Sequence, residues 1–130
     1  MLEQLLTSHD VVDLTGDETL MDKLFRGVIP RRNIGKPYAT TRYELAMWLK
    51  SEDREIKFDY DPTITIADIL NIKETARFLN VNNNTARNLL RKYIPSKRFG
   101  FNLGTLKPIL DKWRSQASWK TRQEKMAVGG

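Results

Sequence analysis

The chain has 130 residues, of which 40% are hydrophobic and 29% charged, a balance typical of one compact globular domain or two very small ones. It contains no cysteine, which excludes disulfides and cysteine–zinc sites, and no apolar run approaches the ~18 residues that a membrane-spanning helix needs. The net charge of +6 is uneven: residues 1–65 hold 9 Lys/Arg and 12 Asp/Glu, whereas residues 66–130 hold 13 Lys/Arg and 4 Asp/Glu, which favours a polyanionic partner.

Residues 5–51 are predicted to form a first unit of three short helices and a β-hairpin. Ser8 is expected to cap the first helix, and Gly16 turns the chain between the first two helices. A Lys/Arg-rich stretch without acidic residues runs from Lys23 to Arg42. The helices are expected over residues 10–15, 17 or 18 to 25, and 41–50, and the hairpin strands over residues 31–34 and 38–40.

Residues 52–68 are predicted to be an ordered linker with short strands. Ile56, Phe58 and Tyr60 alternate with polar residues, which is the pattern of a half-buried strand. Residues 63–66 form a second candidate strand after an Asp-Pro turn. A unit of about 45 residues buries only a small core, so we expect the two halves of the chain to share one.

Residues 69–116 are predicted to repeat the order of elements of the first unit. Asn80 ends the first helix, because asparagine tolerates the left-handed conformation, and Asn82 or Asn83 caps the second. The helices are expected over residues 72–79, 84–93 and 105–115, with a hairpin over residues 97–103. The remaining residues, 117–130, form a basic C-terminal tail.

The two units are copies of one sequence pattern. Upstream of the turn at Gly16 the copies are offset by 64 residues, and downstream of it by 65. The 65-residue offset places the following residues on identical ones: Ile29, Pro30, Gly35, Thr40, Leu45 and Trp48. Helix, turn, helix, hairpin and helix make a winged helix-turn-helix. We therefore predict an α+β fold, mainly α with small β-hairpins, in which two winged helix-turn-helix units form an internal pseudo-twofold dimer.

Two stretches resemble the excisionase-type winged helix, a family related to mercury-resistance-type regulators. They are LLTSHDVVDLTG…IPRRNIGKPYATTRYELAMWL and LNIKETARFLNVNNNTARNLLRKYIPSKRFG. Two such motifs in one small chain resemble the TraN-type DNA-binding proteins of Gram-positive conjugative plasmids. The resemblance implies a cytoplasmic, monomeric protein that binds double-stranded DNA and has an accessory or regulatory role in plasmid transfer by type IV secretion.

The second helix of each unit is where a helix-turn-helix reads base edges in the major groove. Asparagine can bind adenine, and arginine guanine, through two hydrogen bonds each, whereas other Lys and Arg side chains hold phosphates. The candidate base-reading residues are Asn82, Asn83, Asn84, Thr85, Arg87 and Asn88, although one or two of the asparagines could serve only as caps. Further candidate DNA contacts are Arg91, Lys92, Lys97 and Arg98 in the second unit, and Thr19, Lys23, Arg26, Arg31, Arg32 and Lys36 in the first.

The first unit departs from the family pattern in its second helix. That helix begins with DETLMD, residues 17–22, which places three acids among six positions where the family has polar and basic residues. Negative charge opposes contact with DNA, so we expect this helix to contribute little base reading while the arginines that follow it bind phosphates. The asparagine-rich copy is expected to do more of the reading.

The sequence is also compatible with other functions. Within the same chemistry, the chain could be an excisionase-type recombination directionality factor, which bends DNA, or a transcriptional regulator. The acidic helix would also suit a protein–protein adaptor on a winged-helix scaffold, with transfer-complex or recombinase proteins as partners.

An enzyme, a cofactor, a metal site and a membrane partner are not expected. The chain has one histidine, His9, which is predicted to be an ordinary surface residue, and it lacks a glycine-rich phosphate loop and a paired-carboxylate motif. The N-terminus, MLEQLLTSHD, has no basic region followed by a long apolar stretch, so no signal peptide is predicted.

Overall fold

The computed structural model describes residues 1–35 and 37–116, in which the same order of elements occurs twice. The first series consists of η1 (Leu2–Gln4), β1 (Leu5–Leu6), α1 (Ser8–Thr15), α2 (Thr19–Phe25), β2 (Arg32–Asn33), β3 (Tyr38–Thr41) and α3 (Arg42–Ser51). The second series consists of η2 (Ile66–Asp68), β4 (Ile69–Leu70), α4 (Ile72–Leu79), α5 (Asn83–Lys92), β5 (Lys97–Phe99), β6 (Asn102–Leu106) and α6 (Lys107–Ser115).

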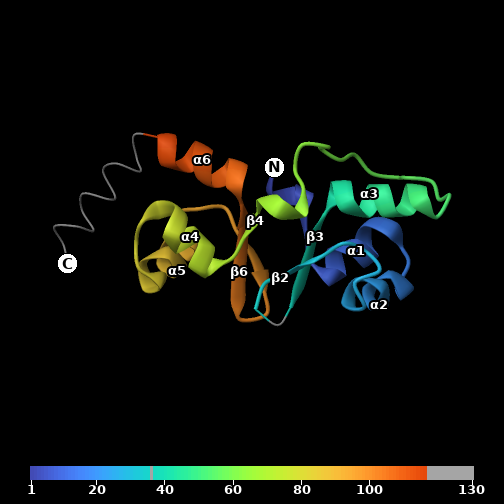
Figure 1. Ribbon diagram of the computed structural model, residues 1–130, viewed down its shortest axis with the longest axis horizontal. Coiled ribbons are helices and arrows are strands. Elements are labelled where there is room, and N and C mark those ends of the chain that lie inside the picture. The colour runs from blue at the N-terminus through green and yellow to red at the C-terminus, as the bar shows by residue number, and fades with distance from the viewer. Residues whose placement is uncertain (36, 117–130) are drawn as a thin grey trace.

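The strands of the described residues pair into two small antiparallel sheets with matching strand order. In the first sheet β3 lies between β1 and β2, and in the second β6 lies between β4 and β5. The register places Leu5 opposite Thr41, Arg32 opposite Ala39, Ile69 opposite Leu106, and Lys97 opposite Gly104. Figure 1 shows the sheets at the centre of the molecule, with α1, α2 and α3 on one side and α4, α5 and α6 on the other. The described residues therefore form an α+β fold.

Side-chain caps mark the start of four of the α-helices that the structure describes, α1, α3, α4 and α5. Thr7 caps α1: its hydroxyl oxygen accepts a hydrogen bond from the Asp10 N–H, and the Asp10 carboxylate accepts one from the Thr7 N–H. The prediction that Ser8 is the cap was wrong by one residue, because Ser8 is already helical. In the second series, Asn71 and Glu74 make the same pair of hydrogen bonds at the start of α4.

The turns after the first helix of each series were predicted correctly. Gly16 follows α1 with a φ of 69°, and Asn80 follows α4 with a φ of 56°, so both occupy the left-handed region. All six helices of the described residues begin and end within two residues of their predicted limits. Helices this short are defined by their caps and turns, which are local in sequence.

The start of α6 differs from the prediction for a reason outside the helix itself. Residue 105 was expected to open the helix, but Thr105 still belongs to β6, and α6 begins at Lys107. The buried Thr105 hydroxyl donates a hydrogen bond of 2.8 Å to the Pro95 carbonyl oxygen. Thr40 donates in the same way to Pro30, at 2.7 Å. Each hairpin is thereby tied to the chain that enters it.

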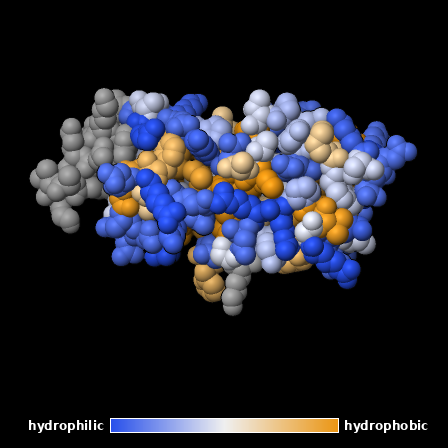
Figure 2. All heavy atoms as spheres, viewed as in Figure 1, coloured by the Kyte–Doolittle hydropathy of each residue, from blue (hydrophilic) through white to orange (hydrophobic). Residues whose placement is uncertain are grey.

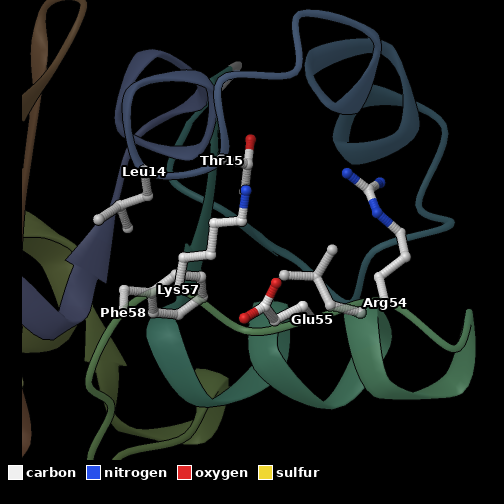
Figure 3. Close-up of a pocket in the computed structure, with 7 residues that line it drawn as sticks. Leu14, Thr15, Arg54, Glu55, Lys57 and Phe58 are labelled. Carbon is white, nitrogen blue, oxygen red and sulfur yellow. The ribbon is translucent and has the colours of Figure 1, made fainter.

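The linker contains no strand, so the two strands predicted within residues 56–66 are wrong. Its apolar residues pack singly instead: Ile56 and Phe58 contact the core of the first half, and Ile64 lies in the core of the second. The linker runs back alongside α3 (Figure 1). The linker, α3 and α1 line a hollow of ≈ 260 Å³ (Figure 3). An alternating pattern forms a strand only where its backbone pairs with another strand, and residues 52–68 make no such pair.

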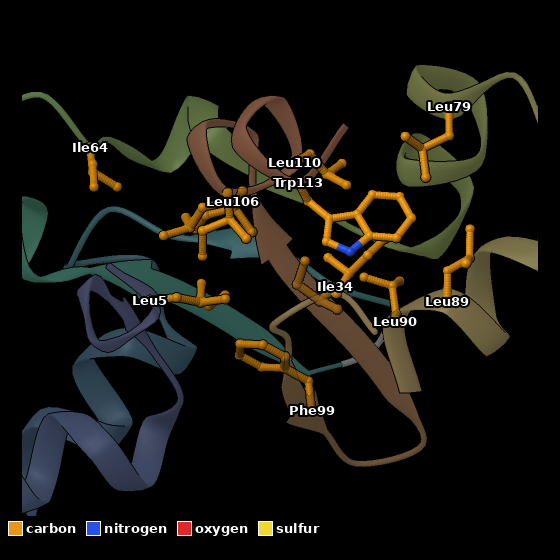
Figure 4. Packing of buried hydrophobic residues seen from close by; sticks show 14 residues of the cluster. Leu5, Ile34, Ile64, Leu79, Leu89, Leu90, Phe99, Leu106, Leu110 and Trp113 are labelled. Carbon is orange, nitrogen blue, oxygen red and sulfur yellow. The ribbon is translucent and has the colours of Figure 1, made fainter. Parts of the chain in front are cut away.

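The main hydrophobic core is built from both halves of the chain. Residues of α4, α5, α6 and the second sheet pack with Leu5, Ile34 and Ala39 from the first half (Figure 4). A second, smaller cluster lies between α1, α2 and α3 and contains Leu20, Leu24 and Leu45 among others. The expectation that the two halves share a core is therefore confirmed.

Two ion pairs cross between the halves at equivalent positions. Arg32, next to the first hairpin turn, reaches Glu74 at the start of α4 and the carbonyl oxygen of Ile69. Lys97, at the start of the second hairpin, lies 2.9 Å from Asp10 at the start of α1. Each hairpin thus contributes a cation to the capping carboxylate of the other half. All four side chains are about one quarter to one third exposed, so water screens these pairs only partly.

Gly104 is required by the size of its neighbour. A Cβ atom at Gly104 would lie 2.9 Å from the Phe99 ring, whereas the equivalent pair in the first half is Ala39 with the smaller Ile34. We expect Gly104→Ala to lower the free energy of unfolding by about 1–3 kcal/mol through overpacking. The Phe99→Ile change copies the residue pair of the first half, so Gly104→Ala should lower the free energy of unfolding less in that background. Urea unfolding of the wild type, the two single variants and the double variant measures this coupling. Equal costs in both backgrounds would contradict the packing argument.

The Asp10–Lys97 pair should make stability depend on pH. Partial burial raises the pKa of Asp10, but hydrogen bonds from the Thr7 N–H and from Lys97 outweigh it, and the net pKa lies below the ordinary value. The ionised Asp10 carboxylate therefore contributes fully to the free energy of unfolding above its unfolded-state pKa of about 3.9. This contribution is lost as the pH falls through the lower folded-state pKa. Asp10→Asn keeps an acceptor for Thr7, should cost about 1 kcal/mol at pH 7, and should flatten the acid limb of the stability profile.

The exposed Asp13 on the same helix provides the matched control. Asp13→Asn removes the same charge without removing a partner of Lys97, so its acid limb should stay closer to that of the wild type. Thermal or urea unfolding between pH 7 and pH 3 gives both profiles. An Asp10→Asn profile parallel to the wild-type profile would refute the assigned role of the pair.

Candidate nucleic-acid interface

The helix α5 presents one apolar face to the core and one polar face to solvent. Ala86, Leu89 and Leu90 are buried against the rest of the second half. Asn82 is the cap, since its side-chain oxygen accepts a hydrogen bond of 2.8 Å from the Thr85 N–H. This settles which asparagine starts the helix, and it leaves the asparagines within the helix for other contacts.

Besides the cap Asn82, which is also exposed, three of the predicted base-reading residues are exposed to solvent. Asn83, Asn84 and Asn88 are exposed. The oxygen of Asn84 accepts a hydrogen bond of 3.4 Å from the Arg87 guanidinium, which aligns an amide and a guanidinium one helical turn apart. Such a pair offers donors and acceptors together, which is the chemistry that discriminates base edges in a major groove.

Three predicted cations of the second half make no hydrogen bond or ion pair with any described residue. They are Arg91, Lys92 and Arg98, and all three are exposed. Arg91 and Arg98 line a hollow of ≈ 310 Å³ between α5 and the hairpin formed by β5 and β6. Ser96, in the same hollow, donates a hydrogen bond of 2.7 Å to the Leu90 carbonyl oxygen and so ties the hairpin to the end of α5. The hairpin and the helix therefore form one continuous basic surface.

Acidic residues are absent from this part of the sequence. Residues 83–98, from the start of α5 into β5, contain five Lys/Arg and no Asp/Glu. In Figure 2 hydrophilic residues cover most of the face over α5, while hydrophobic residues show between hydrophilic ones nearer α4 and α6. Cations without nearby carboxylates keep their attraction for phosphate, because no internal ion pair competes for them.

The corresponding helix of the first half, α2, has a different surface. Thr19 donates its hydroxyl proton to the Asp17 carboxylate, at 2.6 Å, and Asp17 also pairs with Arg54 of the linker. Arg26 lies 2.9 Å from Asp22, and both side chains are mostly exposed. The predicted contacts Thr19 and Arg26 are therefore both engaged with acidic side chains of their own half.

The other predicted cations of the first half that the structure describes also have internal contacts. Arg31 stacks 3.8 Å from the centre of the Tyr38 ring and donates a hydrogen bond to the Leu24 carbonyl oxygen. Lys23 lies 5.8 Å from the ring centre of Trp48. Arg32 and Lys97 belong to the two crossed ion pairs, while Lys36 lies outside the described residues. The structure thus separates the predicted residues into a free group on the second half and an engaged group.

One residue at this surface was missed by the sequence analysis. Phe101 is 96% exposed and lies in the turn between β5 and β6. Strand alternation would place residues 99 and 101 on the same face and so predicts a buried Phe101. The strand instead ends at Phe99, and the turn at Gly100, with its φ of 63°, directs Phe101 away from the core.

Comparison with known proteins adds no relative from which a function could be transferred. No family model, no curated protein and no solved structure matches this chain. Among residues 1–35 and 37–116, no helix has the length and apolar character needed to cross a membrane. The polar face of α5 and the basic hollow beside it are therefore the candidate functional site.

Proposed function

We propose that this chain is a non-enzymatic, double-stranded DNA-binding protein, and that α5 is its main reading helix. The observation that carries the proposal is the continuous surface on which exposed Asn83, Asn84 and Asn88 lie beside Arg91 and Arg98, without acidic residues among them. Amide side chains suit base edges and unpaired guanidinium groups suit phosphates, so one surface supplies both parts of sequence-specific binding.

We interpret the two series of elements as tandem winged helix-turn-helix units related by a pseudo-twofold axis. Several equivalent contacts support this interpretation: both first helices begin with a capping box, both hairpins tie a threonine to a proline carbonyl, and the ion pairs cross reciprocally. In this arrangement two helices would address successive major grooves, about 34 Å apart, with the hairpins on the DNA backbone.

The two units would contribute unequally. The acidic residues around α2 and the internal partners of Arg26, Arg31 and Arg32 leave the first half few cations for phosphate. The first unit would then serve mainly to orient the second, while α5 supplies most of the base contacts.

For the cellular role, we propose an accessory or regulatory protein of conjugative plasmid transfer, on the strength of the resemblance of its two motifs. An excisionase-type factor or a transcriptional regulator would use the same chemistry. Footprinting on DNA from the genetic element that encodes the protein separates these roles, since each would protect a different site: a transfer origin, an attachment site or a promoter.

A protein-adaptor role is favoured by one observation only, the exposed acidic residues Glu18, immediately before α2, and Asp22 within it. An adaptor would show no retention on duplex DNA at low salt and would instead capture a transfer-complex or recombinase protein. Salt-dependent duplex binding that survives reversal of these two charges would count against it.

Removal of a phosphate contact should change the salt dependence of binding. We expect Arg91→Ala and Arg98→Ala each to weaken binding of all duplex sequences alike and to reduce the slope of log K against log salt by about 0.9. Lys57→Ala, an exposed linker cation far from α5 in the chain, is the control of equal charge and should leave the slope nearly unchanged. Fluorescence anisotropy titrations at salt concentrations of about 50 to 300 mM give this slope for each variant. Wild-type binding that ignores salt would sink the proposal.

Removal of a base-contacting residue should change the preference among DNA sequences rather than the salt dependence of binding. We expect Asn84→Ala combined with Arg87→Ala to reduce discrimination between a selected duplex and a scrambled one by about 1–3 kcal/mol per lost base contact. Asn82→Ala is a matched control, because loss of this cap should lower stability by about 1 kcal/mol while preference is retained in the folded fraction. Competition binding gives the preference, and unchanged discrimination in the double variant would reject α5 as the reading helix.

A further inference from the structure

The tip of the second hairpin carries an apolar ring that the protein itself does not cover. Phe101 is 96% exposed, whereas the other exposed large hydrophobic residues among those described, Met1, Phe25, Val28 and Tyr93, are exposed by 44% to 49%. Single exposed apolar side chains are common on protein surfaces, so exposure alone assigns no role. The support for the ring and the charges around it distinguish Phe101.

The hairpin anchors the backbone from which this ring projects. Gly100 takes the left-handed conformation, with a φ of 63°, so that Phe99 and Asn102 pair across a two-residue turn. Phe99, immediately before the turn, is buried in the main core. At the base of the hairpin, Lys97 is bound to Asp10 and the Thr105 hydroxyl to the Pro95 carbonyl oxygen. The Phe101 ring is therefore presented by an anchored strand pair rather than by a loose loop.

The ring lies in a basic environment. Phe101 lines the same hollow as Arg91 and Arg98, both without internal partners, and no acidic residue lines it. An apolar plane flanked by guanidinium groups matches a partner that has apolar planes between rows of negative charge. Stacked base pairs between two phosphate backbones have this character. A purely apolar protein pocket would not use the two arginines.

We propose that Phe101 is a wedge that inserts between base pairs in a minor groove, partly unstacks them and kinks the duplex. The proposal rests on the proposed function, because it places α5 in the adjacent major groove. The hollow shared by α5 and the hairpin would then straddle one phosphate backbone, with Arg91 and Arg98 on its phosphates and Phe101 reaching the groove beyond. Apolar wedges of this kind kink DNA by ~20–90°.

The wedge belongs to the second half alone. At the 65-residue offset, the position equivalent to Phe101 is Lys36, which cannot insert an apolar plane into a base stack. The kink is therefore asymmetric and lies on the side of the site that α5 reads. A symmetric pair of kinks would disagree with this assignment.

The test uses the full chain and a duplex of ~30 base pairs selected by the wild-type protein. End labels report bending by energy transfer, and 2-aminopurine placed at successive steps reports unstacking. We expect wild-type protein to bend the duplex and to raise 2-aminopurine fluorescence at one step beside the α5 footprint. Phe101→Ala should abolish both signals and weaken binding roughly threefold to tenfold, with the salt slope unchanged. Phe101→Leu, which keeps an apolar wedge, should retain most of the bend.

The possible outcomes separate failure of the wedge proposal from failure of the proposed DNA-binding function. If the wild-type protein shows no salt-dependent duplex binding, the proposed function fails and the wedge with it. If Phe101→Ala binds, bends and unstacks as the wild type does, the wedge is wrong while duplex binding by α5 stands. If bending persists in Phe101→Ala but binding to a transfer or recombinase protein is lost, the ring serves a protein contact and the wedge is also wrong. Circular dichroism confirms that each variant is folded.

Discussion

The crossed packing of the two hairpins at the centre of the molecule is the constraint on which the other features depend. Ile34 of the first hairpin lies in the core of the second half, and a Cβ atom at Gly35 would lie 2.5 Å from the Asn102 side chain of the other hairpin. Beside this contact, Arg32 of the first hairpin pairs with Glu74, and Lys97 of the second pairs with Asp10. Each carboxylate caps a helix of the other half. Units of about 45 residues bury too little apolar surface to be stable singly, so each half completes the core of the other.

This packing has a consequence for the surface that faces a partner. The same contacts that join the halves engage Arg32 and Lys97, while Arg31 is held by Tyr38 and Arg26 by Asp22. Arg91, Lys92 and Arg98, which have no side-chain partner among the described residues, lie on α5 and the hairpin beside it. The two similar halves therefore differ in the charge that they present at the second helix and hairpin. For a DNA-binding protein this difference would fix polarity on the duplex, since α5 and its hairpin present amide groups together with unpaired guanidinium groups.

The features predicted correctly from the sequence are those that depend on near neighbours. Asn80 and Gly16 mark turns because few residue types accept a positive φ, and the helices between them follow from caps and apolar spacing. The incorrect predictions concern structure that depends on residues distant in the sequence. The alternation of Ile56, Phe58 and Tyr60 is a valid strand pattern, but the linker pairs with no strand, and Ile56 and Phe58 pack against the smaller apolar cluster instead.

By itself the sequence determined the repeated order of elements, the shared need for a core and the residue types at the candidate interface, because a helix period, a cap or a turn is encoded within a few positions. Only the tertiary structure decided which charges are available. Arg32 and Lys97 look no different in sequence from Arg91 and Arg98, yet their carboxylate partners lie 42 and 87 residues away in the chain. The free energy of an ion pair depends on distance and burial in space, and sequence separation carries no information about either.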